Sequence, residues 1–161
     1  MPFLVPFQEE HKQGFIRWNR NAEEVHRFAA TGFTYPITLD QIGNFPEKIG
    51  AIAFALLSDE GQHLANGDFV VDDALAEVRL CRLIVDPEER GKGYGQHLVK
   101  LLISEAKKQK PDYRVSLNVL ADNPTAIAIY EKCGFQMTDL AFSFEAGGKT
   151  YSGFKMYFHE G

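Results

Sequence analysis

Apolar and polar positions alternate through the middle of the chain, which predicts extended strands joined by short turns. The alternation covers residues 49–58, 62–72 and 76–86. Three consecutive strands with acidic turns between them are typical of an antiparallel meander. Inside the third strand the apolar phase changes, from Val78 and Leu80 on one parity to Leu83 and Val85 on the other. We expect a β-bulge there, because one extra residue moves every later side chain to the opposite face.

Helical spacing of apolar residues predicts the longest helix over residues 94–109, with cations near its end and Pro111 as its stop. Nearer the amino terminus, Asn21 is expected to cap a helix that runs toward Ala30. Thr38 and Gln41 have the spacing of a capping box before Ile42. These signals predict helical segments on both sides of the meander in the chain.

The remaining periodic segments predict four more strands and one more helix. The strands are expected at residues 3–7, 115–120, 135–146 and 150–158, the last two forming a hairpin around Gly147 and Gly148. Asn123 is a suitable cap for a helix over residues 123–133, and Gly134 suits its left-handed stop. The predicted order is therefore β-α-α-β-β-β-α-β-α-β-β.

Glycines at alternate positions separate the third meander strand from the long helix. Gly91, Gly93 and Gly95 let the backbone turn its N–H groups toward a ligand, and a helix start leaves further donors free. Arg90 and Lys92 add positive charge at the same place. We therefore expect a phosphate-binding loop here.

Two common glycine motifs do not fit the spacing of this loop. A P-loop would need glycine where Asp86 stands and Ser or Thr where Gly93 stands. A dinucleotide fingerprint would need glycine in place of Gln96. The remaining pattern, Arg-x-x-Gly-x-Gly over residues 90–95, resembles the coenzyme A loop of the GCN5-related N-acetyltransferases (the GNAT superfamily).

A second pattern strengthens this resemblance. Residues 123–135 read Asn-x-x-Ala-x-x-x-Tyr-x-x-x-Gly-Phe, which is similar to the other GNAT signature at every spacing. The resemblance implies an α/β (mixed α+β) fold: a central, mostly antiparallel twisted sheet splayed at its middle strands and flanked by about four helices. It also implies one acetyltransferase domain over residues 1–161.

The resemblance implies acetyl coenzyme A as co-substrate, with its pyrophosphate on the loop and its pantetheine arm paired like an added strand along the preceding strand. The residues it places at the cofactor are Leu83, Ile84, Val85, Arg90, Gly91, Lys92, Gly93, Tyr94, Gly95, Asn123, Ala126 and Tyr130. The implied reaction is direct attack of a primary amine, from a small molecule or a protein, in a ternary complex. The alternative is a non-catalytic acyl-coenzyme A-binding or regulatory module.

Two side chains are candidates for proton transfer. Glu77 is the candidate base, directly or through water, because it lies near the start of the central strand. Tyr130 occupies the family position of the acid that protonates the departing sulfur. Each has a structural alternative: Glu77 as a solvated carboxylate beside Arg79, and Tyr130 as a core aromatic residue. Cys81 as an acyl-enzyme nucleophile is disfavoured, because no Cys-His signature accompanies it.

The acceptor is not identified by any motif. Trp18, Phe33 and Tyr35 are candidates to line its pocket, and equally candidates for the core. His97 is a candidate phosphate contact or a surface residue. A cationic acceptor such as a polyamine or an aminoglycoside is favoured only by the acidic net charge, and acceptance of a longer acyl chain stays open.

Composition narrows the remaining possibilities. The chain has 161 residues, 45% of them hydrophobic, which suits one core. A net charge of −5 argues against a nucleic-acid or anionic-membrane partner. The two cysteines form no framework and the five histidines have no ligand spacing, so we expect reduced thiols and no metal. The expectation is a cytoplasmic protein, with tail strands available to pair across a homodimer.

Overall fold

The computed structural model describes residues 1–160, and its strands form one seven-stranded sheet. The strands are β1 (Phe3–Pro6), β2 (Ala51–Leu57), β3 (His63–Asp72), β4 (Glu77–Val85), β5 (Arg114–Leu120), β6 (Phe135–Ala146) and β7 (Lys149–Phe158). Their order across the sheet is β1-β2-β3-β4-β5-β7-β6. Only β4 and β5 are parallel neighbours, so the sheet is mostly antiparallel, as predicted.

The helices agree with the expected order and add one short element. They are α1 (Lys12–Arg17), α2 (Ala22–Ala29), α3 (Leu39–Ile42), α4 (Tyr94–Gln109) and α5 (Pro124–Lys132), with short 3-10 turns at Glu9–His11, Glu47–Ile49 and Pro87–Glu89. The strand expected from residue 49 begins at Ala51, because the preceding residues form one of these turns. Five α-helices thus stand where about four were expected.

The predicted capping box before Ile42 is only half formed. Thr38 Oγ1 accepts a hydrogen bond from the Gln41 amide at 3.3 Å, so Thr38 does cap α3. The Gln41 side chain, however, bonds the backbone of Thr34 and Pro36. Gln41 therefore holds the preceding aromatic loop against the helix start.

The sheet separates between β4 and β5. Their pairing covers only Glu77–Leu80 against Arg114–Leu117, although β4 continues to Val85 and β5 to Leu120. Just past the last pair, Arg82 has a positive φ of 46°, and the register of β4 against β3 shifts. The predicted bulge is confirmed, and it lies at the point where the two strands diverge.

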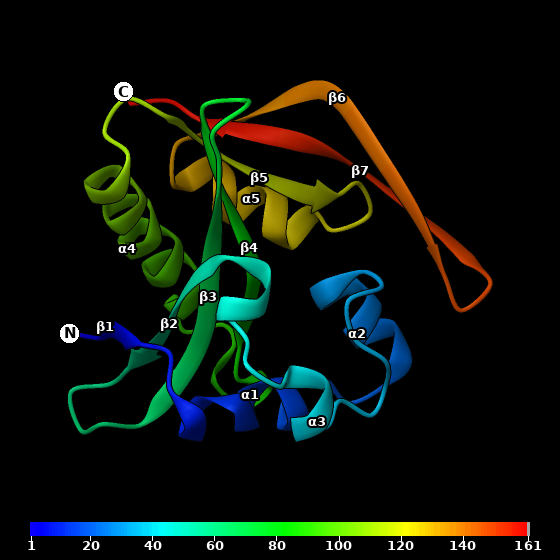
Figure 1. Ribbon diagram of the computed structural model, residues 1–161. Coiled ribbons are helices and arrows are strands. Elements are labelled where there is room, and N and C mark those ends of the chain that lie inside the picture. The colour runs from blue at the N-terminus through cyan, green and yellow to red at the C-terminus, as the bar shows by residue number, and fades with distance from the viewer. Residues whose placement is uncertain (161) are drawn as a thin grey trace.

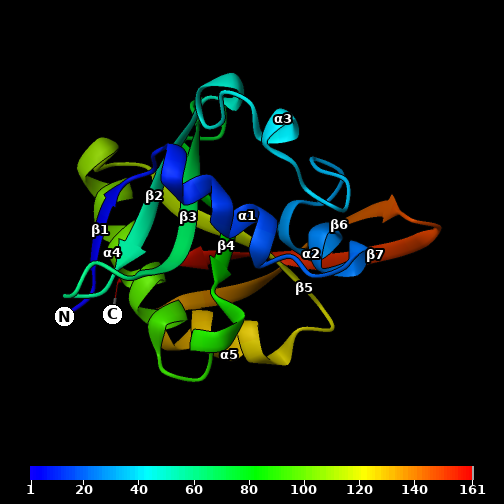
Figure 2. The same ribbon diagram turned by 90° about the horizontal axis from the view of Figure 1, so that it is seen from below.

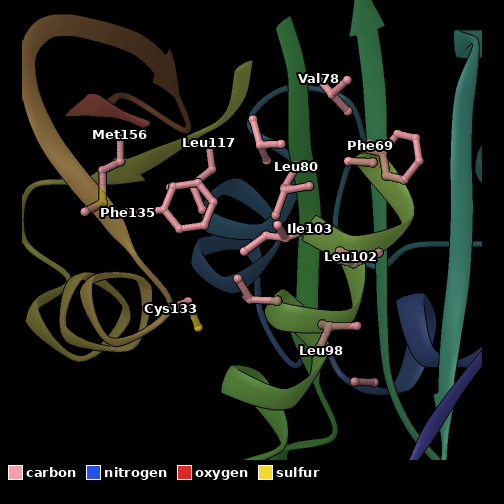
Figure 3. Packing of buried hydrophobic residues seen from close by; sticks show 14 of the residues in the cluster. Phe69, Val78, Leu80, Leu98, Leu102, Ile103, Leu117, Cys133, Phe135 and Met156 are labelled. Carbon is pink, nitrogen blue, oxygen red and sulfur yellow. The ribbon is translucent and has the colours of Figure 1, made fainter. Parts of the chain in front are cut away.

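Two hydrophobic cores cover the two faces of the sheet. On one face α4 and α5 pack against the central strands: Leu98, Leu102 and Ile103 of α4 contact side chains of β3 and β4 (Figure 3). Full burial of each such side chain contributes about 1.5–3 kcal/mol. The other core joins α1, α2 and α3 to β2, and Figure 2 shows these helices and α5 on opposite sides of the sheet.

Helix α2 is held to the carboxyl-terminal half of the chain. The β6–β7 hairpin extends well past the other strands (Figure 1), and its Tyr151 hydroxyl lies 3.2 Å from His26 Nδ1. Arg27 forms a bidentate ion pair with Asp122, with a shortest distance of 2.7 Å. These contacts fix α2 beside the divergent ends of β4 and β5.

Two further features of the described residues bear on the sequence predictions. No helix is both long and apolar enough to cross a membrane. Residues 1–160 also contain no group of three or more His, Cys, Asp or Glu side chains placed to hold a metal ion.

Candidate functional site

A cavity of about 620 Å³ lies at the divergent end of β4. Its walls come from four segments: the end of β4, the glycine loop with the start of α4, the start and middle of α5, and the corner between α1 and α2. These segments are far apart in the sequence. The separation of β4 from β5 brings them around one space.

The glycine loop presents a row of unused backbone donors to this cavity. Gly93 has a φ of +88° and precedes the first residue of α4, Tyr94. None of the amides from Gly91 to Gly95 donates a hydrogen bond to another described residue. A helix start adds a partial positive charge behind such donors, so the loop suits an anion that bridges several amides.

The two cations of the loop are used differently. Arg90 lines the cavity and has no carboxylate partner among residues 1–160; its Nε donates to the Val85 carbonyl at 3.3 Å. Lys92 does not line the cavity, and its ammonium pairs at 2.6 Å with Glu89, which does. In the structure Lys92 neutralises a loop carboxylate, and its contact with a cofactor stays a prediction.

The end of β4 offers an unpaired backbone edge. Ile84 and Val85 pair with β3 on one side, while the side that faces β5 has no strand partner after Leu80. Leu83, Ile84 and Val85 all line the cavity. An extended ligand with alternating N–H and C=O groups would find complementary main-chain groups along this edge.

Helix α5 supplies three of the predicted residues. Asn123, Ala126 and Tyr130 all line the cavity, and Asn123 Oδ1 caps the helix by accepting from the Ala126 amide at 3.2 Å. The Tyr130 hydroxyl makes no hydrogen bond to another described residue. Burial raises the pKa of Tyr130 to about 12. The phenol is therefore fully protonated at neutral pH and available as a proton donor.

Glu77 is not brought to the cavity. It opens β4, whereas Leu83 lies six residues along the strand, or about 20 Å at about 3.3 Å per residue. Its buried carboxylate accepts hydrogen bonds from Lys155 Nζ at 2.8 Å, Ser116 Oγ at 3.1 Å and the Tyr157 hydroxyl.

The same contacts make Glu77 a weak base. Burial alone would raise its pKa, but the hydrogen bonds from Lys155, Tyr157 and Ser116 outweigh burial and hold the pKa below its ordinary value. A carboxylate with a lowered pKa accepts a proton less readily. The place and the chemistry of Glu77 therefore both fit a role in holding β4, β5 and β7 together.

A second buried ion pair lies at the bulge. Arg82 makes two hydrogen bonds to Asp68 on β3, one of them at 2.6 Å, and its guanidinium stands over the Phe45 ring. Burial raises the pKa of Asp68 to about 6 even though Arg82 favours its ionised form. The pair joins the divergence point of the sheet to the core beneath α1–α3.

The corner between α1 and α2 contributes residues that the motifs did not indicate. Besides Trp18, which the sequence offered as a pocket or core residue, the cavity is lined by Asn19, Glu24, Arg27 and Phe28. Phe33 packs in the second core and Tyr35 is 44% exposed, and neither lines the cavity. Cys81 and His97 also lie outside its lining.

Asn19 has an unsatisfied oxygen. The side chain is 3% exposed, its Nδ2 donates to the Phe15 carbonyl at 2.9 Å, and its Oδ1 is the only buried side-chain polar atom of the described residues without a partner. Such an orphan costs about 1–3 kcal/mol. The only sequence signal for it was a polar residue directly beside a buried Trp18.

The splayed sheet and the glycine loop at a helix start have the arrangement that the sequence resemblance predicted for an acetyltransferase, and the comparisons agree with that class. The acetyltransferase (GNAT) family model matches residues 4–135. An N-acetyltransferase 9-like protein of Caenorhabditis briggsae is 26% identical over 157 residues, which is 88% of this chain and 78% of that protein.

Two further relatives extend the comparison. A putative [ribosomal protein bS18]-alanine N-acetyltransferase of Bacillus subtilis is 30% identical over 117 residues, or 71% of this chain and 74% of that protein. The crystal structure of a Vibrio cholerae spermidine N-acetyltransferase with CoA and spermine has a TM-score of 0.79, covering 97% of this chain and 94% of that one. At 18% identity this last likeness concerns the fold.

The chain therefore belongs to the GNAT acetyltransferase family. The predicted fold, the activity as an N-acetyltransferase and the use of acetyl coenzyme A are confirmed by the family match and the named relatives. The same findings favour an enzyme over a non-catalytic binding module.

Proposed function

We propose that the cavity binds acetyl coenzyme A with its pyrophosphate on the amides of Gly91–Gly95 and its pantetheine along Leu83–Val85. The observation that carries this proposal is the row of free amides beside Arg90, in a cavity shared with Tyr130. The thioester then lies at the divergence of β4 and β5, between Tyr130 and the α1–α2 corner. A primary amine enters from that corner.

The reaction is a direct transfer with balanced protons. The lone pair of the neutral amine attacks the thioester carbonyl carbon and forms a C–N bond. The C–S bond breaks, its electron pair leaves with sulfur, and Tyr130 donates its proton to that sulfur. The extra proton on the new amide nitrogen returns to the tyrosinate through water, leaving N-acetylated amine, coenzyme A and the original phenol.

Alignment is the main contribution of the protein. Holding amine and thioester together can supply about 7–11 kcal/mol. The two carboxylates that line the cavity are engaged, Glu24 by Arg20 and Glu89 by Lys92, and these hydrogen bonds hold the pKa of each below its ordinary value. We assign amine deprotonation to water, and a structural role to Glu77.

This assignment favours acceptors with a moderate pKa. At pH 7, deprotonating the ammonium to the reactive neutral amine costs about 1 kcal/mol for an α-amine with a pKa near 8. For a lysine-like amine the same step costs about 4–5 kcal/mol. The spermidine N-acetyltransferase of Vibrio cholerae and the Bacillus subtilis protein named for a ribosomal-protein alanine represent these two types of amine. Both belong in a substrate panel.

A thermal melt with coenzyme A tests the binding site. At a coenzyme A concentration of 100 times its Kd, binding should raise the free energy of unfolding of the wild-type protein by about 2.7 kcal/mol. Gly93→Asp places a carboxylate against the pyrophosphate; repulsion at about 5 Å in an effective dielectric of about 20 is about 3 kcal/mol, or about 100-fold in Kd. The gain should then fall to about 0.4 kcal/mol.

Gly61→Asp is the matched control. Gly61 also has a φ of +88°, and at both glycines no atom lies within 4 Å of the position that a Cβ would take, so both variants carry the same backbone strain in open space. Gly61 lies in the β2–β3 turn and does not line the cavity. An equal loss of the coenzyme A shift in both variants, or no shift in the wild type, would contradict the proposed site.

A further inference from the structure

Two histidines lie next to an aromatic residue of the cavity wall. The ring centroids of His11 and His63 are 4.8 Å apart, and the His63 ring is 4.7 Å from the ring of Trp18. Trp18 lines the cavity at the α1–α2 corner, whereas neither histidine does. The proposed acetyl transfer uses neither histidine. Two titratable rings are therefore in contact with the wall of the site without taking part in its chemistry.

Close packing holds the Trp18 indole in place. A Cβ on Gly14 would lie 2.8 Å from an indole carbon and 2.7 Å from Asn66 Nδ2, so a larger residue would push these groups apart. Asn66 Nδ2 donates to the His11 carbonyl at 3.2 Å, and Asn66 Oδ1 lies 2.7 Å from His63 Nε2. The indole is thus packed against the backbone of α1 and against the His63 ring.

The hydrogen bonds distinguish the two rings as proton acceptors. Because Asn66 Nδ2 donates to the His11 carbonyl, Asn66 Oδ1 is the atom that faces His63, and His63 Nε2 carries a proton in both charge states. His11 Nδ1 accepts from the Gln8 amide at 2.9 Å, which requires a neutral ring. A further proton would break this bond of His11 but would leave the bond of His63 to Asn66 intact. His63 is therefore the ring that can become charged without losing a hydrogen bond.

Burial opposes that charge. It lowers the pKa of His63 below its ordinary value of 6.5. The groups that favour the charged ring, without outweighing burial, are Asn66, the Ala65 backbone, Asp86 and Glu10. Burial and the neighbouring His63 also lower the pKa of His11, which Glu10 alone opposes. His63 is thus neutral at pH 7, and its charge develops next to the indole only in mildly acidic solution.

We propose that His63 is a positioning residue, which holds the Trp18 indole in the α1–α2 corner of the cavity while its ring is neutral and releases it when the ring is protonated. This inference rests on the proposed function, which brings the amine in at that corner. A charged ring needs water that the packed site does not supply, so protonation favours separation of the two rings. The acceptor amine then binds less tightly as the pH falls.

Tryptophan fluorescence tests the contact directly, because Trp18 is the only tryptophan of the chain. An imidazolium quenches a neighbouring indole more strongly than a neutral imidazole does. Emission of the unliganded wild-type protein should change in a one-proton transition with a midpoint below pH 6.5. The transition should be absent from His63→Gln, whose amide can still donate to Asn66. His159→Gln is the control and should keep it, because His159 is exposed and lies outside the cavity lining.

The amine KM tests the effect on the acceptor, with spermidine and a short peptide with an amino-terminal alanine as substrates. Comparing the wild type with His63→Gln at each pH cancels the ionisation of the amine itself. If only neutral His63 gives a corner that binds the amine, the ratio of the wild-type KM to the variant KM should rise about tenfold at one pH unit below the fluorescence midpoint. The corresponding ratio of the Kd values for coenzyme A should stay constant.

Each other result contradicts the proposal. A transition that persists in His63→Gln would mean that another group titrates, and a midpoint above 6.5 would mean that the indole stabilises the charged ring. A KM ratio independent of pH would remove the effect on the acceptor. If the wild-type protein binds coenzyme A but acetylates neither amine, the proposed function fails, and the fluorescence titration still decides whether His63 controls Trp18. If His63→Gln does not fold, wild-type NMR decides: the imidazole protons in contact with the indole must titrate at the fluorescence midpoint.

Discussion

The two ends of strand β4 use polar groups in opposite ways. At its start, Glu77 is buried with three partners from β5 and β7. At its end, the edge of Leu83–Val85, the amides of Gly91–Gly95 and Asn19 Oδ1 all lack protein partners. The loop amides and the strand edge lie around one cavity and can bind a ligand there, whereas the saturated network at the start of the strand indicates a structural role.

The tyrosines at the two ends give the largest expected contrast. Tyr130→Phe should lower kcat by about 10²–10⁴-fold, the usual range for losing a general acid. Coenzyme A binding should persist, because the loop amides are intact. Tyr157→Phe, which removes only a donor to Glu77, should leave kcat within about twofold. Steady-state kinetics on both variants checks this, and equal kcat losses would remove the acid role of Tyr130.

Arg82 lies between the two ends of β4, and replacing it tests the contribution of its ion pair with Asp68 to stability. Arg82→Leu leaves Asp68 buried without its cation and should cost about 3–5 kcal/mol of unfolding free energy at pH 7.5. Urea unfolding measures this loss.

The sign of the pH dependence follows from the raised pKa of Asp68. With a folded pKa of about 6 against 3.8, the native state binds more protons than the unfolded state between these values, so its contribution to stability falls as pH rises through about 6. Without Arg82 that pKa rises further, and at pH 5 the carboxyl is neutral in both proteins. The deficit of Arg82→Leu should therefore shrink at pH 5; a deficit independent of pH would contradict the ion-pair explanation.

Glu77→Gln separates the structural from the catalytic interpretation. The substitution should lower the free energy of unfolding by about 1–3 kcal/mol, because Lys155 loses its charged partner. Since the folded pKa of Glu77 is lowered, its contribution is present above the ordinary carboxyl pKa and is lost as pH falls below it. The kcat/KM profile between pH 6 and 9 should keep its wild-type shape. A rate loss that alkali restores would return the base role to Glu77.

The pH dependence of the wild-type reaction tests which group takes the proton from the amine. If water takes the proton, kcat/KM should rise by up to about tenfold per pH unit and level off at the pKa of the acceptor itself. Two acceptors with different pKa values should therefore give different midpoints. A common midpoint for both would reveal an enzyme group as the base.

Much of the fold could be predicted because its signals are local. The parity change after Leu80 identified the bulge, and Asn21 and Asn123 cap helices as their positions suggested. The loop around Gly93 was also predictable, because a glycine with a positive φ directly before a helix can be inferred from the residues next to it in the sequence. The ion pair of Lys92 with Glu89 was not predicted, although the two residues are only three apart in the sequence.

By itself the sequence determined the order of strands and helices, the glycine loop before α4, and the family. Each of these depends on side-chain periodicity or on backbone geometry within a few neighbouring residues. Only the tertiary structure decided which polar groups stay free. Glu77 acquires partners 39 to 80 residues away, whereas Asn19 Oδ1 is buried with none. Whether a buried polar atom finds a hydrogen-bond partner depends on residues that are far away in the sequence. A local sequence pattern does not show which of them will pack against it.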